Sequence, residues 1–164
     1  MRILITGMSG SGKSTLVAAL ANCGHQAVDL DTPAWSEYRV LTEDEVPPGV
    51  EPGRDWVWRE DRVAELLSTA SDQPLFLAGC APNQGRFRRE LDRVVLLTAP
   101  VEVTLTRLVT RTTNPFGKHP EERAKILADK AAFEPLLRAS SDLVVETTEP
   151  VEATVRRLLN LVKR

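Results

Sequence analysis

Eight residues near the start of the chain have the types and spacing that hold a phosphate chain. Gly7, Gly12, Lys13 and Ser14 satisfy the pattern G-x-x-x-x-G-K-S/T, between an apolar run and a helical pattern. Glycines allow positive φ and let backbone N–H groups approach phosphate oxygens, and the start of the helix adds its positive dipole end. We expect Lys13 to reach the β- and γ-phosphates and the Ser14 hydroxyl to ligate magnesium. The segment therefore predicts a nucleoside triphosphate site formed by Gly7, Ser9, Gly10, Ser11, Gly12, Lys13, Ser14 and Thr15. Within this set, Thr15 is expected to serve as a residue of the helix more than as a ligand.

Two carboxylates follow the next apolar run. Asp29 and Asp31 alternate along an extended segment, which predicts that their side chains point to opposite faces. One could ligate magnesium while the other accepts a proton from the acceptor, and we assign Asp29 to the metal and Asp31 to the acceptor. The alternative is a solvated strand end, with Asp31 capping a short helix from Thr32. We favour the functional interpretation because open α/β sheets bind ligands where their strands end.

Arg107 and Arg111 are four residues apart and share one face of a predicted helix. A segment rich in helix breakers follows them, from Thr112 to His119. We expect the two arginines to bind the nucleotide, to close over its phosphates and to neutralise the charge that develops in transfer, and Lys118 could join them. The alternative is a solvated basic stripe.

Polar residues near the second and third predicted strands are candidates for the other half of such a site. Arg59 follows an acidic segment, Gly79 ends the third strand, and Gln84 and Arg86 lie in a polar, basic stretch after it, together with Asn83. We expect them to surround a small-molecule acceptor opposite Asp31. Three tryptophans flank the same region and could stack on a flat acceptor, although tryptophans more often close a core: Trp35, Trp56 and Trp58.

Apolar runs alternate with helical patterns along the chain, which is typical of a parallel sheet built from βαβ units. Strands are predicted near residues 3–6, 27–29, 75–78, 94–97 and 143–145, and helices near 16–22, 57–71, 101–109, from 120 onward and 151–162. Turn-forming residues at 47–49 and 52–53 predict an irregular excursion from Thr32 to Asp55. The sequence therefore predicts an α/β fold in which the glycine loop follows the first strand and Asp29 ends the second.

With these motifs the chain resembles the small P-loop kinases: shikimate kinase, gluconate kinase, adenylate kinase and their relatives. The resemblance rests on the glycine loop, on Asp29-Leu30-Asp31, on Gly79-Cys80-Ala81, on Arg107-Leu108-Val109-Thr110-Arg111 and on the run from Phe133 to Thr147. It implies a three-layer fold, a five-stranded parallel sheet flanked by helices, with a substrate-binding region at about 32–62 and a small lid at about 111–120. It also implies ATP and magnesium as cofactors and a catalytic set of Lys13, Asp31 and Arg111.

The chain departs from the shikimate kinase pattern in three places. Gly79 is the single glycine where that family has three, and neither residues 32–55 nor the lid at 111–118 has the usual sequence. We therefore predict an ATP-dependent phosphotransferase whose acceptor, a hydroxyl or a phosphate, stays open. The rival hypothesis is an ATP-binding switch protein without a small-molecule acceptor; the guanine-specifying N-K-x-D tetrapeptide of GTPases is absent.

Bulk composition narrows the class of protein further. A chain of 164 residues with 42% hydrophobic and 27% charged content predicts one folded domain over residues 1–164. A net charge of −2 argues against nucleic acid as a partner, and the sequence shows neither a long apolar run nor a signal peptide. Cys23 and Cys80 fit no disulfide framework and are expected to be reduced core residues. We expect a cytoplasmic protein that binds no membrane.

Overall fold

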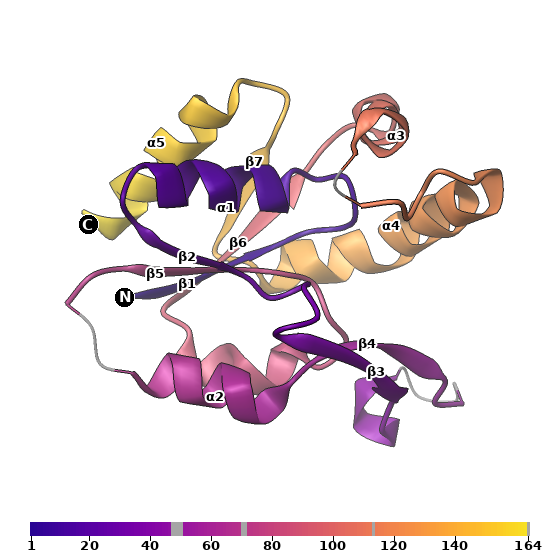
Figure 1. Ribbon diagram of the computed structural model, residues 1–164, viewed down its shortest axis with the longest axis horizontal. Coiled ribbons are helices and arrows are strands. Elements are labelled where there is room, and N and C mark those ends of the chain that lie inside the picture. Colours follow the sequence, from indigo (N-terminus) through magenta and orange to yellow (C-terminus); the bar gives the residue numbers. More distant parts are fainter. Residues whose placement is uncertain (47–50, 70–71, 113, 164) are drawn as a thin grey trace.

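A parallel sheet forms the centre of the protein. The computed structural model describes residues 1–46, 51–69, 72–112 and 114–163. The sheet has five parallel strands in the order β2–β5–β1–β6–β7 (Figure 1), which confirms the predicted sheet. Their bounds are β1 Arg2–Thr6, β2 Gln26–Asp29, β5 Leu75–Ala78, β6 Arg93–Thr98 and β7 Leu143–Glu146.

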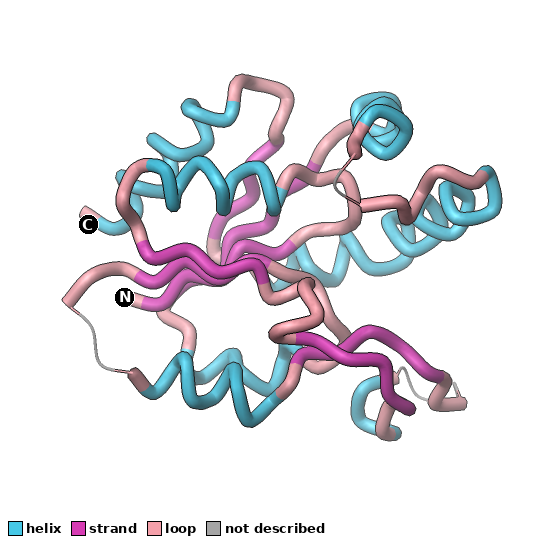
Figure 2. The backbone as a smooth tube through the Cα atoms, viewed as in Figure 1, coloured by secondary structure: helices cyan, strands magenta, loops and turns pink. Residues whose placement is uncertain are grey.

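Helices pack on both faces of this sheet (Figures 1 and 2). Along β1, Ile3 and Ile5 belong to the buried cluster that includes residues of α1 (Lys13–Asn22) and α5 (Val151–Val162). Leu4, between them, belongs instead to the cluster that includes α2 (Glu60–Ser68), because successive side chains of a strand point to opposite faces. Each fully buried Leu or Ile contributes about 1.5–3 kcal/mol, so the two clusters fix the sheet between its helical layers.

Two further helices extend to the side of the molecule where the carboxyl ends of the sheet strands lie (Figure 1). They are α3 (Val101–Thr110) and α4 (Pro120–Ser140). The predicted helix start at Pro120 agrees with the observed one, with Glu121 and Glu122 in its first turn, where free N–H groups favour acids. No helix in the described part of the chain is long and apolar enough to cross a membrane.

The predicted irregular excursion from Thr32 to Asp55 is wrong in part. Strands β3 (Ser36–Val40) and β4 (Arg54–Trp58) form an antiparallel pair beside the main sheet, with a short 3-10 helix, η1 (Glu43–Glu45), between them. The turn-forming residues at 47–49 lie outside the described residues. A helix beginning at Val57 was also wrong, because β4 continues to Trp58 and α2 begins at Glu60.

Other local expectations also needed correction. The polar stretch after β5 forms a 3-10 helix, η2 (Gln84–Glu90). No helix begins at Thr32, where the chain turns instead, so Asp31 is not a helix cap. Both cysteines are free, as expected, but Cys23 is exposed at the end of α1 rather than in the core, and Cys80 is half-buried.

Candidate functional site

The glycine loop joins β1 to α1, as its sequence pattern predicts. Gly7 has a φ of +151° and Gly12, at the N-cap of α1, a φ of +100°, which L-residues with a side chain rarely adopt. A Cβ on Gly7 would also lie 2.4 Å from the carbonyl oxygen of Leu97. The loop is therefore a compact turn at the centre of the sheet, directly before the N-terminus of a helix, where anions are favoured.

Lys13 and Ser14 begin α1 and connect the loop to the two predicted aspartates. Lys13 Nζ donates to the carbonyl oxygen of Gly7 at 2.6 Å and lies 3.7 Å from Asp31 Oδ2. Ser14 Oγ donates to Asp29 Oδ2 at 2.7 Å. The structure thus gives each carboxylate its own partner on the helix, Asp29 the hydroxyl and Asp31 the ammonium group. Thr15 is exposed in the same turn.

Asp31 is held in a largely buried position. Its Oδ1 accepts the backbone N–H of Cys80 at 3.1 Å and the indole N–H of Trp58 at 3.4 Å, and its side chain is 29% exposed. Burial raises the pKa of this carboxyl above its usual value of 3.8, while Lys13 opposes the shift. Gly79 packs against it: a Cβ there would lie 2.8 Å from Asp31 Oδ1.

Arg107, in the last turn of α3, and Arg111, the residue that follows this helix, both reach the glycine loop. Arg107 Nη1 donates to the carbonyl oxygen of Gly10 at 3.2 Å and to Thr147 Oγ1 at 2.8 Å. Arg111 Nη2 donates to Ser9 Oγ at 3.3 Å. Burial lowers the pKa of both guanidinium groups, which still remain charged near neutral pH. The two arginines therefore lie beside the loop where a phosphate chain would bind.

Three buried side-chain atoms among the described residues have no hydrogen-bond partner, and two of them belong to this part of the structure. They are Ser11 Oγ and Arg111 Nε, and the third is Arg59 Nε. An unsatisfied buried polar atom costs about 1–3 kcal/mol. A polyanion bound at the loop would supply acceptors for such donors.

The residues predicted to surround an acceptor are largely engaged with protein groups. Arg86 Nη1 donates to Glu60 Oε1 at 2.7 Å, and Arg59 Nη1 donates to Glu37 Oε2 at 2.7 Å. Gln84 Oε1 accepts the hydroxyl of Thr6 at 3.0 Å. Of the five predicted acceptor residues, only Asp31 and Gly79 lie together next to Lys13 in these contacts.

Asn83 is buried, and its amide bonds both backbone groups of Trp58, so it fixes the end of β4 rather than facing a ligand. One residue with contacts at the site, Thr147, was given no role there from the sequence. Thr147 joins the glycine loop to Arg107, since its hydroxyl also donates to the carbonyl oxygen of Ser11 at 2.8 Å. Trp56 donates its indole N–H to the carbonyl oxygen of Asp31 at 3.3 Å.

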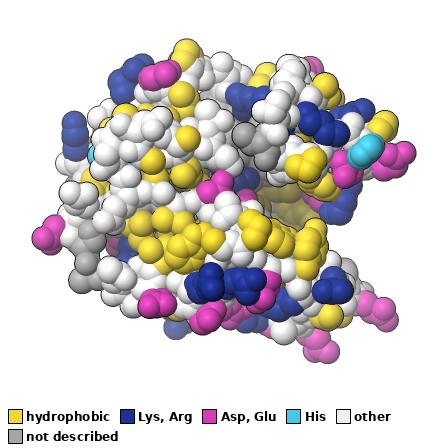
Figure 3. Space-filling model, in the orientation of Figure 1, with side chains coloured by type: hydrophobic (Ala, Val, Ile, Leu, Met, Phe, Trp, Pro, Cys, Tyr) yellow, Lys and Arg dark blue, Asp and Glu magenta, His cyan; other side chains and the backbone are white. Residues whose placement is uncertain are grey.

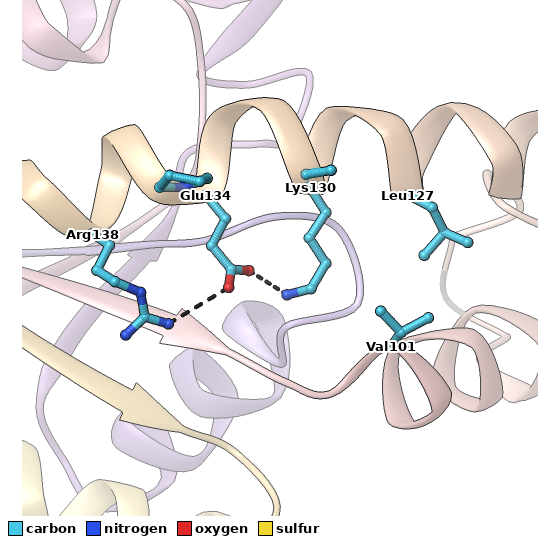
Figure 4. Close-up of a pocket in the computed structure, with 7 residues that line it drawn as sticks. Val101, Leu127, Lys130, Glu134 and Arg138 are labelled. Atoms are coloured by element: carbon cyan, nitrogen blue, oxygen red, sulfur yellow. Dashed lines mark hydrogen bonds and ion pairs between the residues drawn. The ribbon is translucent and has the colours of Figure 1, made fainter.

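A hollow of about 480 Å³ lies apart from these residues, between α4 and the start of α3 (Figure 4). Lys130 and Glu134 form an ion pair in it, and Arg138 lies 3.7 Å from the same carboxylate. None of the site residues predicted from the sequence lines this hollow. A second depression is visible in Figure 3, between the side of the molecule with α3 and α4 and the side with the β3–β4 pair, and hydrophobic side chains gather inside it.

Together, the central parallel sheet, the glycine loop at the end of β1 and the lysine and serine that open α1 define a P-loop nucleotide-binding protein. Known proteins of this class resemble the chain over most of its length. The family described as AAA domain matches residues 3–128. The shikimate kinase of Chlorobium chlorochromatii (strain CaD3) is 29% identical over 175 residues, which cover 99% of this chain and 90% of that protein.

Solved structures show the same fold. The shikimate kinase from Acinetobacter baumannii in complex with shikimate has a TM-score of 0.62 at 19% identity, covering 98% of this chain and 92% of the other. The shikimate kinase from Bacteroides thetaiotaomicron has a TM-score of 0.60 at 19% identity, covering 100% and 99%. The chain therefore belongs to the AAA domain family, and its predicted resemblance to the P-loop kinases of the shikimate and adenylate kinase-like superfamily is confirmed. Its predicted class, an ATP-dependent phosphotransferase of unspecified acceptor, is confirmed at that level.

Proposed function

We propose that the protein transfers the γ-phosphoryl group of ATP to a hydroxyl or phosphate group of a small molecule, with magnesium. The observation that carries this proposal is that the two aspartates have different partners at the start of α1. Asp29 accepts a hydrogen bond from the hydroxyl of Ser14. The carboxylate of Asp31, whose side chain is 29% exposed, lies 3.7 Å from the ammonium group of Lys13. A donor side and an acceptor side thus meet at Lys13.

On the donor side, the glycine loop and Lys13 hold the phosphate chain. In the structure, Lys13 donates to the carbonyl oxygens of Gly7 and Met8 in the loop itself. Its ammonium group could therefore rotate to a phosphate without breaking a short ion pair, since Asp31 is 3.7 Å away. Arg107 and Arg111 neutralise charge beside the loop. We propose that residues 111–120 act as a lid that excludes water; Thr113 lies outside the described residues.

On the acceptor side, Asp31 holds the proton of an attacking hydroxyl. Its raised pKa makes it a stronger base than an exposed aspartate, and the charge of Lys13 opposes that rise. The region 32–62, of which residues 47–50 lie outside the described residues, would position the acceptor. Arg59, Gln84 and Arg86 would act there through the groups that they bond.

The donor set at Ser14 and Asp29 fits magnesium. A hydroxyl and a carboxylate are hard oxygen ligands, and magnesium takes most of its remaining ligands from phosphates and water. The described residues contain no cluster of three His, Cys, Asp or Glu that could hold a metal alone, which agrees with a metal that arrives with the nucleotide. Magnesium held by Ser14 and Asp29 would neutralise charge on the phosphate chain. We propose that the reaction takes place in the cytoplasm, which the two free cysteines and the need for ATP support.

The proposal is tested by ADP formation with a panel of polyols, nucleosides and nucleoside monophosphates. We expect at least one acceptor to raise turnover well above the rate without acceptor, and Lys13→Ala to abolish nucleotide binding. Lys125→Ala is the matched control, because Lys125 is an exposed lysine on α4 that pairs with Asp129. ADP formation that no acceptor accelerates would contradict the kinase and favour the switch protein instead.

A further inference from the structure

A row of aromatic side chains leads away from Asp31 along the β3–β4 pair. Ser36 is opposite Trp58 in the ladder and Tyr38 is opposite Trp56, so these four side chains share one face. Trp58 is 2% exposed, Trp56 is half-buried and Tyr38 is 65% exposed. The rings of Tyr38 and Trp56 meet edge to face, with 5.1 Å between centroids. The row therefore runs from the interior of the protein to its surface.

The inner end of this row is attached to Asp31. The indole N–H of Trp58 donates to Asp31 Oδ1 at 3.4 Å, and that of Trp56 donates to the carbonyl oxygen of Asp31 at 3.3 Å. Both indole donors are thus already used. What Trp56 and Tyr38 still offer a ligand is ring surface, which binds flat or apolar ring faces and adds about 0.5–1.5 kcal/mol per aromatic contact.

Three basic side chains of the same region are already paired with carboxylates. Arg39 is paired with Glu45 at 2.6 Å, Arg59 with Glu37 at 2.7 Å, and Arg86 with Glu60 at 2.7 Å and Asp44 at 2.8 Å. The Glu45 side chain is 1% exposed, and its hydrogen bonds from Arg39 lower its pKa to about 2.

An anionic acceptor anchored on any of these three arginines would have to break a carboxylate pair. Arg54 is an additional cation in this region, exposed at the outer end of β4 beyond Trp56.

From the aromatic row and the paired arginines we propose that the acceptor is an uncharged alcohol that carries a ring, such as a nucleoside. Its ring packs against Trp56 and Tyr38, and one of its hydroxyl groups points to Asp31. The inference rests on the proposed phosphotransfer and narrows its acceptor: phosphate monoesters and carboxylic acids are excluded. The O–H proton of the acceptor passes to Asp31 as the oxygen–phosphorus bond forms and the bond between the γ-phosphorus and ADP breaks.

Matched pairs of acceptors test the proposal with the full chain and Mg-ATP. We expect the kcat/KM for adenosine to be at least about 10-fold above that for AMP, and the kcat/KM for myo-inositol to exceed that for shikimate by a similar factor. Sorbitol, which has no ring, should have a lower kcat/KM than adenosine or myo-inositol. Transfer to AMP, shikimate or sorbitol as efficient as to the neutral ring compounds would overturn this inference and leave the kinase intact. Transfer to no compound of a broad panel would overturn the kinase itself.

Variants separate ring contact from charge. Tyr38→Ala should raise the KM of the best ring acceptor about 3- to 10-fold, and Tyr38→Phe should restore it, because the ring and not the hydroxyl makes the contact. Leu136→Ala is the control for an exposed apolar side chain, since Leu136 is 63% exposed on α4, and should leave that KM unchanged. An unchanged KM in Tyr38→Ala, or a larger rise in Arg54→Ala, would overturn the proposal.

Discussion

Replacing Gly79 by alanine tests the packing that holds Asp31. The added Cβ would lie 2.8 Å from Asp31 Oδ1 and 2.9 Å from Trp58 Cζ2. Neither side can yield easily, because the backbone N–H of Gly79 donates to Ile5 and Trp58 is 2% exposed. Overpacking of this kind costs about 1–3 kcal/mol. In a chain of this size the melting temperature should therefore fall by about 2–12 °C.

The same substitution should also reduce turnover. If Asp31 moves by even a fraction of an ångström, its oxygen leaves the acceptor position, and we expect kcat to fall about 10- to 100-fold while the Kd for ATP changes little. Thermal unfolding and steady-state ADP formation measure the two effects. Gly85→Ala is the matched control, because a Cβ on Gly85 meets nothing within 4 Å. A Gly79→Ala protein with native melting temperature and kcat would refute the reasoning.

Three further predictions concern charge. Burial raises the pKa of Asp31 in the folded state, so the stability linked to this group is fully present below the usual pKa of 3.8 and is lost as pH rises through the folded pKa. Asp31→Asn should therefore be more stable than the native protein at pH 7. Denaturant titration should show this gain in unfolding free energy shrinking toward pH 4. The pKa of Glu45 is lowered to about 2, so the stability that this group contributes is present above its usual pKa of 4.5 and is lost as pH falls through about 2. Glu45→Gln should lose about 3 kcal/mol of unfolding free energy at pH 7, because it leaves Arg39 without its buried partner. A Glu45→Gln protein as stable as the native protein at pH 7 would contradict this prediction. Arg107→Ala should weaken the binding of an ATP analogue about 10-fold, as one charge-assisted contact is lost, and calorimetry showing native affinity would remove Arg107 from the nucleotide site.

The donor half of the site could be predicted because its residues are local in the sequence. A strand, a turn with positive φ and a helix N-terminus follow one another within residues 2–22, so the pattern of glycines, Lys13 and Ser14 is sufficient. The same holds for the strand that ends at Asp29. Parallel pairing then brings β2 beside β5 and Asp31 beside Cys80, an arrangement that the structure shows and the order of apolar runs alone does not give.

The acceptor half could not be predicted because its partners are distant in the sequence. Arg86 bonds Asp44, which is 42 residues away, and Arg59 bonds Glu37, 22 residues away. The alternation from Ser36 to Val40 was a signal for a strand, yet the nearby prolines and glycines favoured an irregular segment. Only the paired strands show that Trp56 and Tyr38 lie on one face and that Trp56 bonds Asp31.

The central claim, that Asp31 serves phosphoryl transfer and not nucleotide binding, is tested most directly by one comparison. The Kd for an ATP analogue and the rate of single-turnover phosphoryl transfer to the best acceptor are measured for the native protein and for Asp31→Asn. We predict a Kd within about threefold of the native value and a transfer rate reduced by about 10²–10⁴, the usual contribution of a positioned base. An Asp31→Asn protein that transfers phosphate at the native rate would contradict the account.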